Sequence, residues 1–318
     1  MALQHPVRIG ARGSKLSLAQ SRMMQARIAA ALGAGPEDVE LAAPLVVITT
    51  TGDRIQDRRL LEIGGKALFT KEIEEALLEG RIDCAVHSLK DVPAELPPGL
   101  ILSAIPERED PRDAFLSHKA SSIDDLPHGA RLGTASMRRQ AQALHRRPDL
   151  DIVMLRGNVD TRLAKLEAGD ADAILLALSG LNRLGLGHLP QSLLDPVQAP
   201  PAPGQGALAI ETRVEDAHAP WLAALHHRPT EIAVAAERGA LFALEGSCRT
   251  AIGAYSWVEG AKLSLLVEAL TPDGAKRFRR EGSVELPHEG GEAVARALGL
   301  ELGNAVRIDG GDLLILSH

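Results

Sequence analysis

The chain is short of aromatic residues, which make up only 2% of it: four Phe, two Trp and one Tyr. Proteins that bind single-stranded nucleic acid commonly stack its bases on aromatic side chains, so this composition argues against such a platform. The sequence pI near 5.9 also argues against a surface that is basic throughout. We therefore expect no nucleic-acid partner, and a core built from aliphatic side chains.

Cysteines and long apolar runs are also scarce. The two cysteines, Cys84 and Cys248, are too few for a disulfide framework or a Cys-rich zinc site, and no metal is expected. No apolar run approaches the roughly 20 residues of a membrane-spanning helix, so no membrane partner is expected. Residues 1–7 are polar and show no signal peptide, so the sequence predicts a cytoplasmic protein.

The composition is otherwise that of an ordinary globular protein. The chain has 318 residues, of which 45% are hydrophobic, and a formal net charge of −7. Residues 7–110 and 111–200 each alternate strand-like and helix-like segments, which predicts two α/β lobes with parallel sheets. Prolines near 106–111 and 196–203 suggest that the chain crosses twice between the lobes. Two crossings would create a hinge with a cleft between the lobes.

From about residue 228 the pattern changes to a small α+β region. An Ala-rich helix from Ile232 to Leu244 precedes two strand candidates, Ala251–Val258 and Leu263–Leu270, and a final helix. The predicted domains are therefore residues 1–106 with 201–224, residues 107–200, and residues 225–318.

Helical spacing also predicts which residues face inward. Ser17 with Gln20 has the pattern of a capping box at the start of a helix. The residues expected inward there are Ala19, Met23, Ala26 and Ala30, and in the final helix Ala293, Ala297 and Leu300.

The region 131–183 carries nine Lys or Arg against six acids, an excess of cations in an acidic chain. Arg138 and Arg139 fall in the first turn of a predicted helix, where each cation is disfavoured by about 0.3–1 kcal/mol. The pair therefore needs an anion, and the hydroxyls of Thr134 and Ser136 would complete a carboxylate or phosphate site. A solvated charged turn is the alternative.

Arg156-Gly157-Asn158 directly follows another predicted strand, where ligands of open α/β sheets bind. Arg162 then falls in the first turn of the next helix and repeats the arrangement of Arg138 and Arg139. Two such sites indicate a ligand with several negative charges. Salt bridges to nearby aspartates would explain the same arginines without a ligand.

The first lobe has polar residues in equivalent places. Arg12-Gly13-Ser14 follows its first strand, and Asp91 follows a later one. A carboxylate there can stabilise a cation or exchange a proton, or can simply be a turn residue. His87 could be a base or a satisfied core histidine. The polar stretch 52–66 is long enough for a flexible lid, or is an ordinary surface loop.

The two cysteines differ in their surroundings. Cys84 lies within a strand and is expected to be buried and inert. Cys248 lies in a Gly-Ser-Cys-Arg turn, where the adjacent Arg249 would lower the pKa of the thiol and favour the thiolate. A free loop cysteine is the alternative, and no Cys–His–Asn spacing supports a protease.

Seven segments in this order give the chain a specific resemblance. They are Ile9–Ser14, Gly64–Phe69, His87–Pro93, Gly133–Arg139, Leu155–Val159, Pro203–Gly206 and Gly246–Cys248. Over nearly its whole length the chain resembles the porphobilinogen deaminase, or hydroxymethylbilane synthase, family. The resemblance implies three α/β-type domains, the first two similar to periplasmic binding proteins.

The resemblance also implies an activity in heme biosynthesis. Such an enzyme joins four porphobilinogen molecules head to tail, releases ammonia at each addition, and frees the linear tetrapyrrole hydroxymethylbilane by hydrolysis. It builds the product on a dipyrromethane cofactor, which a thioether would hold to Cys248. Each pyrrole carries an acetate and a propionate, which accounts for the arginines. A monomer is expected.

Residue roles follow from the same resemblance. Asp91 and Lys90 are expected to be catalytic, with Asp91 holding pyrrole N–H groups and stabilising an azafulvenium cation. The cofactor would be bound by Cys248, Lys90, Asp91, Ser14, Thr134, Ser136, Arg138, Arg139, Arg156 and Gly157. The substrate would be bound by Arg12, Ser14, Arg156, Arg162, Arg183, Phe69 and Gln205, with Phe69 beneath the active-site loop.

Two positions depart from the family pattern and receive no role: Glu62, where some members have lysine, and Asp160, where others have glycine. The rival interpretation is a non-catalytic binding protein for a small anion, because fold alone does not decide function. A covalently modified thiol and a carboxylate in the cleft would distinguish the enzyme from it.

Overall fold

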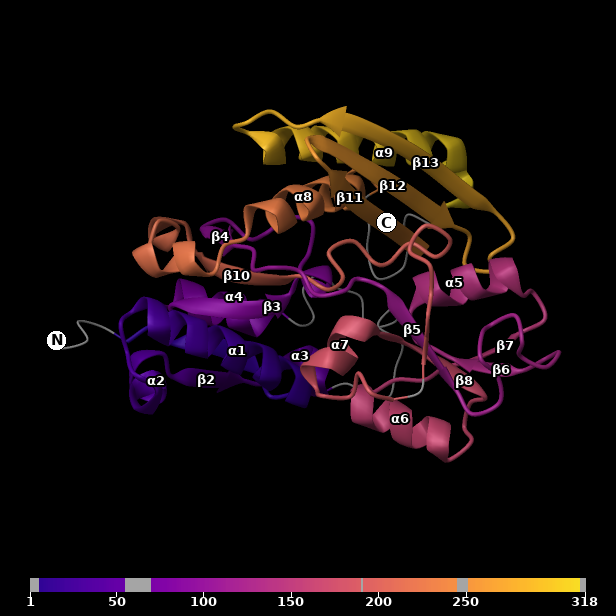
Figure 1. Ribbon diagram of the computed structural model, residues 1–318, viewed down its shortest axis with the longest axis horizontal. Helices are drawn as coiled ribbons and strands as arrows, with labels where there is room; N and C mark the ends of the chain where they lie inside the picture. The colour runs from indigo at the N-terminus through magenta and orange to yellow at the C-terminus, as the bar shows by residue number, and fades with distance from the viewer. Residues whose placement is uncertain (1–5, 55–69, 190, 245–250, 315–318) are drawn as a thin grey trace. The chain divides into compact units, whose positions relative to one another are not determined.

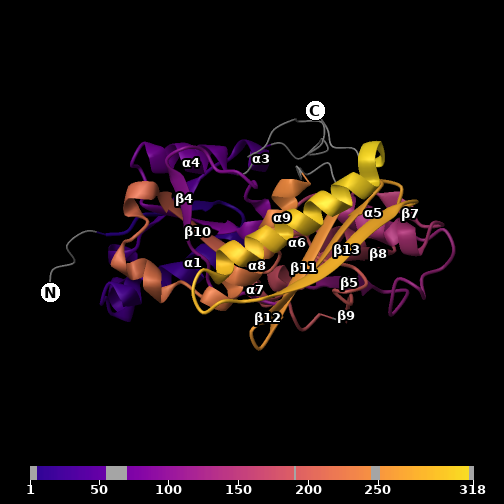
Figure 2. The ribbon, with the colours of Figure 1, turned by 90° about the horizontal axis from the view of Figure 1, so that it is seen from above.

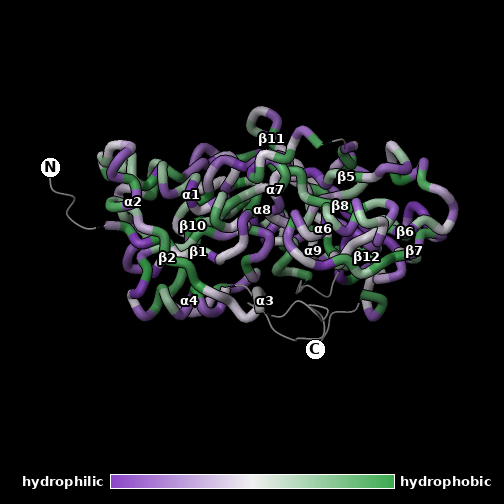
Figure 3. Tube along the Cα trace, turned by 90° about the horizontal axis from the view of Figure 1, so that it is seen from below, coloured by the Kyte–Doolittle hydropathy of each residue, from purple (hydrophilic) through white to green (hydrophobic). Residues whose placement is uncertain are grey.

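The computed structural model describes residues 6–54, 70–189, 191–244 and 251–314. They form two compact units, each considered by itself. The first takes in 6–54, 70–109 and 207–231, and the second 110–189, 191–206, 232–244 and 251–314. Hydrophobic and hydrophilic stretches are interleaved along the trace (Figure 3). Within these ranges, no helix is long and apolar enough to cross a membrane.

The first unit is built on a five-stranded sheet with the order β2-β1-β3-β10-β4 (Figure 1). Strands β1 (Ile9–Arg12), β2 (Leu45–Ile48) and β3 (Cys84–Ser88) are parallel. Strand β10 (Leu208–Arg213) pairs antiparallel with β3 and with β4 (Leu100–Ala104). The chain thus comes back, after the second sheet, to fill an interior place in the first.

The helices of this unit are α1 (Lys15–Ala31), α2 (Val39–Ala42), α3 (Thr51–Arg54) and α4 (Lys71–Leu78). Short 3-10 turns cover Pro36–Asp38, Leu89–Asp91, Val214–Asp216 and Pro220–Ala224. Helix α4 buries Ile73, Ala76 and Leu77, as its apolar spacing predicts. The core beneath α1 includes Ile9, Met24 and Ile28.

Helix α1 corrects two expectations. Its N-cap is Ser14, whose side chain accepts from the backbone N–H of Ser17, so the helix begins earlier than the predicted capping box. Met23, Ala26 and Ala30 are exposed, and the buried face carries Gln20, Ser21, Met24, Gln25, Ile28 and Ala29. The two glutamines can face inward because their amides find hydrogen-bond acceptors: Gln20 Nε2 donates to Ser88 Oγ at 3.0 Å, and Gln25 Nε2 to the Ala43 carbonyl at 2.8 Å.

The second unit contains another five-stranded sheet, with the order β7-β6-β8-β5-β9. Its strands are β5 (Asp113–Ser117), β6 (Arg131–Gly133), β7 (Asp151–Val153), β8 (Ala173–Ala177) and β9 (Ser192–Leu193). Helices α5 (Met137–Arg146), α6 (Val159–Glu167) and α7 (Leu178–Arg183) follow β6, β7 and β8 in turn. Strand β6 is parallel to β7 and β8.

Both large sheets are mixed, which corrects the expectation of parallel sheets. Strand β5 runs antiparallel to β8 and β9, and β10 antiparallel to β3 and β4. A parallel neighbour requires a crossover connection, usually a helix. No helix joins β5 to β6 in the described chain, and β10 is entered from the other unit, so neither strand has such a crossover.

The rest of the second unit is an antiparallel sheet of β11 (Ala251–Glu259), β12 (Lys262–Leu270) and β13 (Arg277–Glu285). Helices α8 (Arg228–Ala243) and α9 (Gly291–Gly310) share a core with it, and a 3-10 turn covers Gly311–Leu313. Helix α9 packs against β12 and β13, and in Figure 2 it runs in roughly the same direction as the strands. Strand β13 was not predicted, because the charges of Arg277, Arg279, Arg280 and Glu281 conceal its alternation.

Helix α9 buries a different face from the predicted one. Ala293 and Ala297 are exposed and Leu300 is only half-buried, whereas Ala295, Leu298, Gly299, Leu302 and Gly303 are buried. The reason is close packing on α8: a Cβ added to Gly299 would lie 2.0 Å from the Ala236 carbonyl oxygen. The prediction followed Ala293, Ala297 and Leu300, whereas Leu298 and Leu302 mark the face that is buried.

The predicted fold class is confirmed: two α/β lobes and a small α+β region. The predicted domain boundaries at residues 106, 200 and 224, together with the hinge and cleft, stay predictions.

Candidate active site

In the first unit, the predicted site residues follow the carboxyl ends of adjacent strands. Arg12 is the last residue of β1, and Ser14 caps the helix that follows. Lys90 and Asp91 lie in the 3-10 turn directly after β3, and both are exposed. Because β1 and β3 are parallel neighbours, these side chains share one edge of the sheet, the usual location of ligands in α/β proteins.

The turn that carries Lys90 and Asp91 is anchored on both sides. The backbone N–H of Leu89 donates to the Ala207 carbonyl at 3.0 Å, and that of Val92 to the Leu89 carbonyl at 3.1 Å. Leu89 and Val92 are both buried. The two polar residues between them are therefore presented outward from a fixed backbone.

The second unit repeats this arrangement. Thr134 follows β6, Arg156 follows β7, and Arg183 lies in α7 directly after β8. These strands are neighbours in the order β7-β6-β8. The backbone N–H of Thr134 donates to the Val153 carbonyl at 3.0 Å and joins two of the strand ends. Thr134 and Arg156 thus lie beyond the ends of neighbouring strands, whereas Arg183 lies at the far end of the helix that follows β8.

The loops at this edge are shaped by caps and by one glycine. Ser136 caps α5 by accepting from the backbone N–H of Arg139, and Asn158 caps α6 by accepting from that of Thr161. Gly157 has φ +118, and a Cβ there would lie 2.7 Å from the Thr161 side chain. Glycine therefore allows the Arg156 loop to lie close to α6.

Arg138 and Arg139 both form ion pairs with the same buried carboxylate, that of Asp113. Arg138 Nη2 lies 2.8 Å from Asp113 Oδ2, and Arg139 Nη2 lies 2.7 Å from Asp113 Oδ1. Burial by itself would raise the pKa of Asp113, but the two guanidiniums hold it well below its ordinary value. The compensating anion deduced from the sequence is thus available within the chain, and a contact of these arginines with the cofactor stays a prediction.

Gln205 and Arg183 are also engaged. Gln205 Nε2 donates to Asp113 Oδ1 at 2.8 Å and to the Pro111 carbonyl at 2.6 Å. Arg183 Nη2 donates to the Gly206 carbonyl at 2.6 Å. Substrate binding by either residue stays a prediction.

One nitrogen of the Arg156 guanidinium needs a hydrogen-bond acceptor. Its Nη1 is buried and has no hydrogen-bond partner among the described residues. A buried donor without an acceptor costs about 1–3 kcal/mol, more when charged. Beside it, Arg162 Nε donates to the Gly157 carbonyl at 2.9 Å. Arg156 therefore favours an acceptor such as a ligand carboxylate.

Several expected residues lie outside the described part of the chain: Cys248, Phe69 and Glu62, with residues 55–66 of the polar stretch. Asp160 lies in the first turn of α6. Cys84 is buried as expected, and burial raises the pKa of its thiol. His87 is a core histidine whose Nε2 lies 2.9 Å from Glu211 Oε2, which favours the structural interpretation over a surface base.

Sequence reasoning missed Asp113 and Glu237. Glu237 is fully buried in α8 and accepts from the backbone N–H of Gly204 at 2.7 Å and from Ser256 Oγ at 2.8 Å. It thereby holds the turn that carries Gln205. The sequence did carry a signal for each: Glu237 is the single acid within the predicted Ala-rich helix, and Asp113 begins a buried strand.

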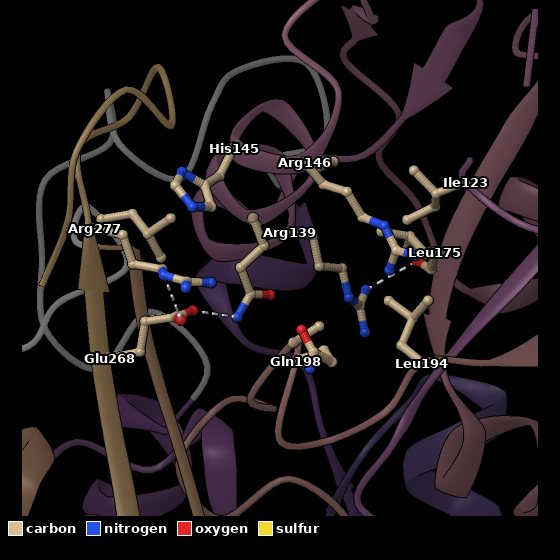
Figure 4. Close-up of a pocket in the computed structure, with 13 residues that line it drawn as sticks. Ile123, Arg139, His145, Arg146, Leu175, Leu194, Gln198, Glu268 and Arg277 are labelled. Carbon is tan, nitrogen blue, oxygen red and sulfur yellow. Dashed lines mark hydrogen bonds and ion pairs between the residues drawn. The ribbon is translucent and has the colours of Figure 1, made fainter. Parts of the chain in front are cut away.

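A pocket of about 350 Å³ lies in the second unit, lined in part by α5 and by strands β12 and β13 (Figure 4). Its charges have partners within the protein. Arg146 pairs with Asp124, and Arg277 Nε lies 3.8 Å from Glu268 Oε2. Burial raises the pKa of Glu268, and the nearby Arg277 opposes that shift. The pocket therefore has no strong requirement for an ionic ligand.

Guanidinium and hydroxyl groups near the carboxyl ends of parallel strands are typical of the class of α/β proteins that bind anionic ligands at this edge. A family model described as "Porphobilinogen deaminase, dipyromethane cofactor binding domain" matches residues 7–220, and "Porphobilinogen deaminase, C-terminal domain" matches 231–307. The chain therefore belongs to the porphobilinogen deaminase family, as the motifs predicted. It is an enzyme of the transferase class.

Two relatives match this chain over almost its whole length. The chain is 72% identical over 316 residues to a porphobilinogen deaminase of Caulobacter sp. (strain K31), covering 99% of each. It is 68% identical over 320 residues to one of Phenylobacterium zucineum (strain HLK1), covering 99% of this chain and 100% of that relative. The periplasmic aliphatic sulphonate binding protein SsuA from Escherichia coli is 15% identical with a TM-score of 0.37, covering 74% of this chain and 69% of that one.

Proposed function

We propose that this transferase joins four porphobilinogen molecules head to tail, loses one ammonia per addition, and releases hydroxymethylbilane with one water. The observation that supports this proposal most is the set of guanidinium and hydroxyl groups in the segments that follow β6, β7 and β8, within the region that matches the family's cofactor-binding domain. Each porphobilinogen has an acetate and a propionate, so a site for its oligomers needs several cations.

The residues present suit dipyrromethane, whose two pyrroles carry four carboxylates. The buried Nη1 of Arg156 calls for an acceptor. The hydroxyls of Thr134 and Ser136 already accept from backbone N–H groups and keep their own protons to donate. We assign the thioether to Cys248. When bound, the cofactor supplies the terminal pyrrole carbon to which the first substrate is joined.

The chain's own groups would then divide the work. Arg156, Arg162 and Arg183 pair with carboxylates, which guanidinium groups bind bidentately. In the first unit, Arg12 and Lys90 provide further cations. Asp91 is exposed at a strand end. There its carboxylate accepts from a substrate pyrrole N–H and stabilises the positive charge that develops on the substrate as ammonia leaves. We also propose a cytoplasmic monomer.

Intact-protein mass spectrometry tests this proposal. Protein from cells that make porphobilinogen should carry an adduct of two pyrrole units, which Cys248→Ser should lack. Cys84→Ala is the matched control and should keep the adduct, because the buried Cys84 is not the attachment site. An unmodified wild-type chain would favour an anion-binding protein instead.

A further inference from the structure

Three ionisable side chains are buried together in the first unit, and none of them has a role in the proposed function. They are Glu74 on α4, His87 on β3 and Glu211 on β10, exposed by 5%, 5% and 0%. His87 Nε2 and Glu211 Oε2 are 2.9 Å apart. Buried charges are costly even when paired, and their best-attested use is to fix structural register.

The surroundings of this cluster also affect the ionisation of Glu74. Burial raises the pKa of Glu74, and the Glu211 carboxylate adds to the effect. The charged groups that act on Glu74 are His87, Glu211 and Glu75. One oxygen each of Glu74 and Glu211 has no hydrogen-bond partner among the described residues.

The pair lies where β3 meets the turn that presents Asp91. In the register of β3 and β10, Ala209 is opposite His87 and Leu208 is opposite Ser88. The next residue, Leu89, donates its N–H to the Ala207 carbonyl. The His87–Glu211 hydrogen bond therefore adds a directional side-chain link to the last paired residues before Lys90 and Asp91. Apolar side chains at these positions would pack without a preferred direction.

We propose that His87 and Glu211 are positioning residues for Asp91, because their buried hydrogen bond fixes the end of β3 against β10. The inference rests on the proposed role of Asp91. Small displacements of a reacting group reduce turnover strongly, since about 1 Å can cost about 100-fold. The pair is thus expected to influence kcat without touching substrate, and KM much less.

The test compares His87→Leu, which removes both ring nitrogens, with His87→Gln, whose amide can reach the position of Nε2. Glu74→Gln is the matched control, since it leaves the pair in place. In His87→Leu that folds and carries the adduct, kcat should fall by about 10–100-fold with KM within about twofold. His87→Gln should recover most of kcat. A kcat for His87→Leu within twofold of wild type, or no recovery in His87→Gln, overturns the proposal.

If His87→Leu does not fold, amide hydrogen exchange in Glu211→Leu, which removes the acceptor of His87 Nε2, decides the matter without activity. The Leu89 N–H should exchange about tenfold faster than in Glu74→Gln, because local opening becomes easier. Equal exchange in the two variants overturns the proposal. Failure of the proposed function would show separately, as a missing adduct on the wild-type chain.

Discussion

The Asp113 carboxylate accepts a hydrogen bond from the amide of Gln205 at 2.8 Å, although the two residues are 92 positions apart. The same oxygen accepts from Arg139 at 2.7 Å, and Arg138 pairs with the other oxygen. Asp113 thus connects the start of β5, the first turn of α5 and the turn at 203–206. One buried acid sets the positions of three residues that were predicted to bind ligands.

Replacing Asp113 with Asn should destabilise the second unit strongly. Two buried guanidiniums would lose their counter-charge, and breaking a buried pair costs about 3–5 kcal/mol. Urea unfolding of wild type and variant measures the difference. Asp124→Asn removes an exposed partner of Arg146 and should cost about 1 kcal/mol or less. Equal losses in the two variants would contradict the role of burial.

The contribution of Asp113 should depend on pH in one direction. Its pKa is lower in the folded protein than its ordinary value, so it stabilises the fold above about pH 4. That stability is lost as the pH falls toward the lowered pKa. The stability gap between wild type and Asp113→Asn should therefore be constant from pH 8 to about 5 and shrink below about pH 4. A gap that widens in acid would reverse the assigned sign.

Asp91→Ala should nearly abolish turnover while the fold and the adduct are kept. The side chain is exposed, so its loss leaves no cavity, whereas removing a preorganised charge-stabilising group costs about 100–1000-fold in kcat. Ammonia release measures the rate, and thermal unfolding with intact mass provides the control. Near-normal turnover would remove Asp91 from the mechanism.

Arg156→Leu should impair chain elongation, because a carboxylate partner would be lost at the edge of the sheet. A hydrogen bond to a charged group contributes about 1.5–3 kcal/mol, so elongation should slow by about 10–100-fold. Mass spectrometry of enzyme-bound intermediates would show which addition is slowed. Arg131→Leu, at the other end of β6, removes a cation remote from this edge and should elongate normally. Identical kinetics in both variants would refute the charge argument.

Gly299→Ala should destabilise the α+β region. The new Cβ would lie 2.0 Å from the Ala236 carbonyl oxygen, and overpacking of this kind typically costs about 1–3 kcal/mol. Ala297→Leu on the same helix adds more volume on an exposed position and should change stability by about 0.5 kcal/mol at most. Chemical denaturation of the two variants shows whether the place of the added side chain matters more than its size. Similar losses of stability in both would argue against the close α8–α9 contact.

Sequence reasoning succeeded where apolar spacing and caps are local. It found α4 with its buried Ile73 and Leu77, the strand end before Asp91, and the helix starts after Thr134 and Gly157. It failed where a residue's environment depends on distant partners. The inward Gln20 and Gln25 of α1 need acceptors from β3 and from the segment before β2.

The same limit applies to Asp113 and to the sheets. The partner that neutralises Arg138 and Arg139 lies well before them in the chain, and spacing along one helix cannot reveal it. The antiparallel pairing of β10 with β3 likewise arises because the chain returns to the first sheet from far along the sequence. Local pattern determines elements, whereas such pairings arise only when the elements assemble.

That return also imposes an order on biosynthesis. Strands β3 and β4 have their facing edges unpaired until residue 213 has left the ribosome, because β10 belongs between them. The sheet of β5 to β9 is complete some twenty residues sooner, with Leu193. The later-encoded sheet is thus the first that can close, while β3 and β4 wait with exposed edges. Unpaired strand edges make nascent chains prone to aggregation and in need of chaperones.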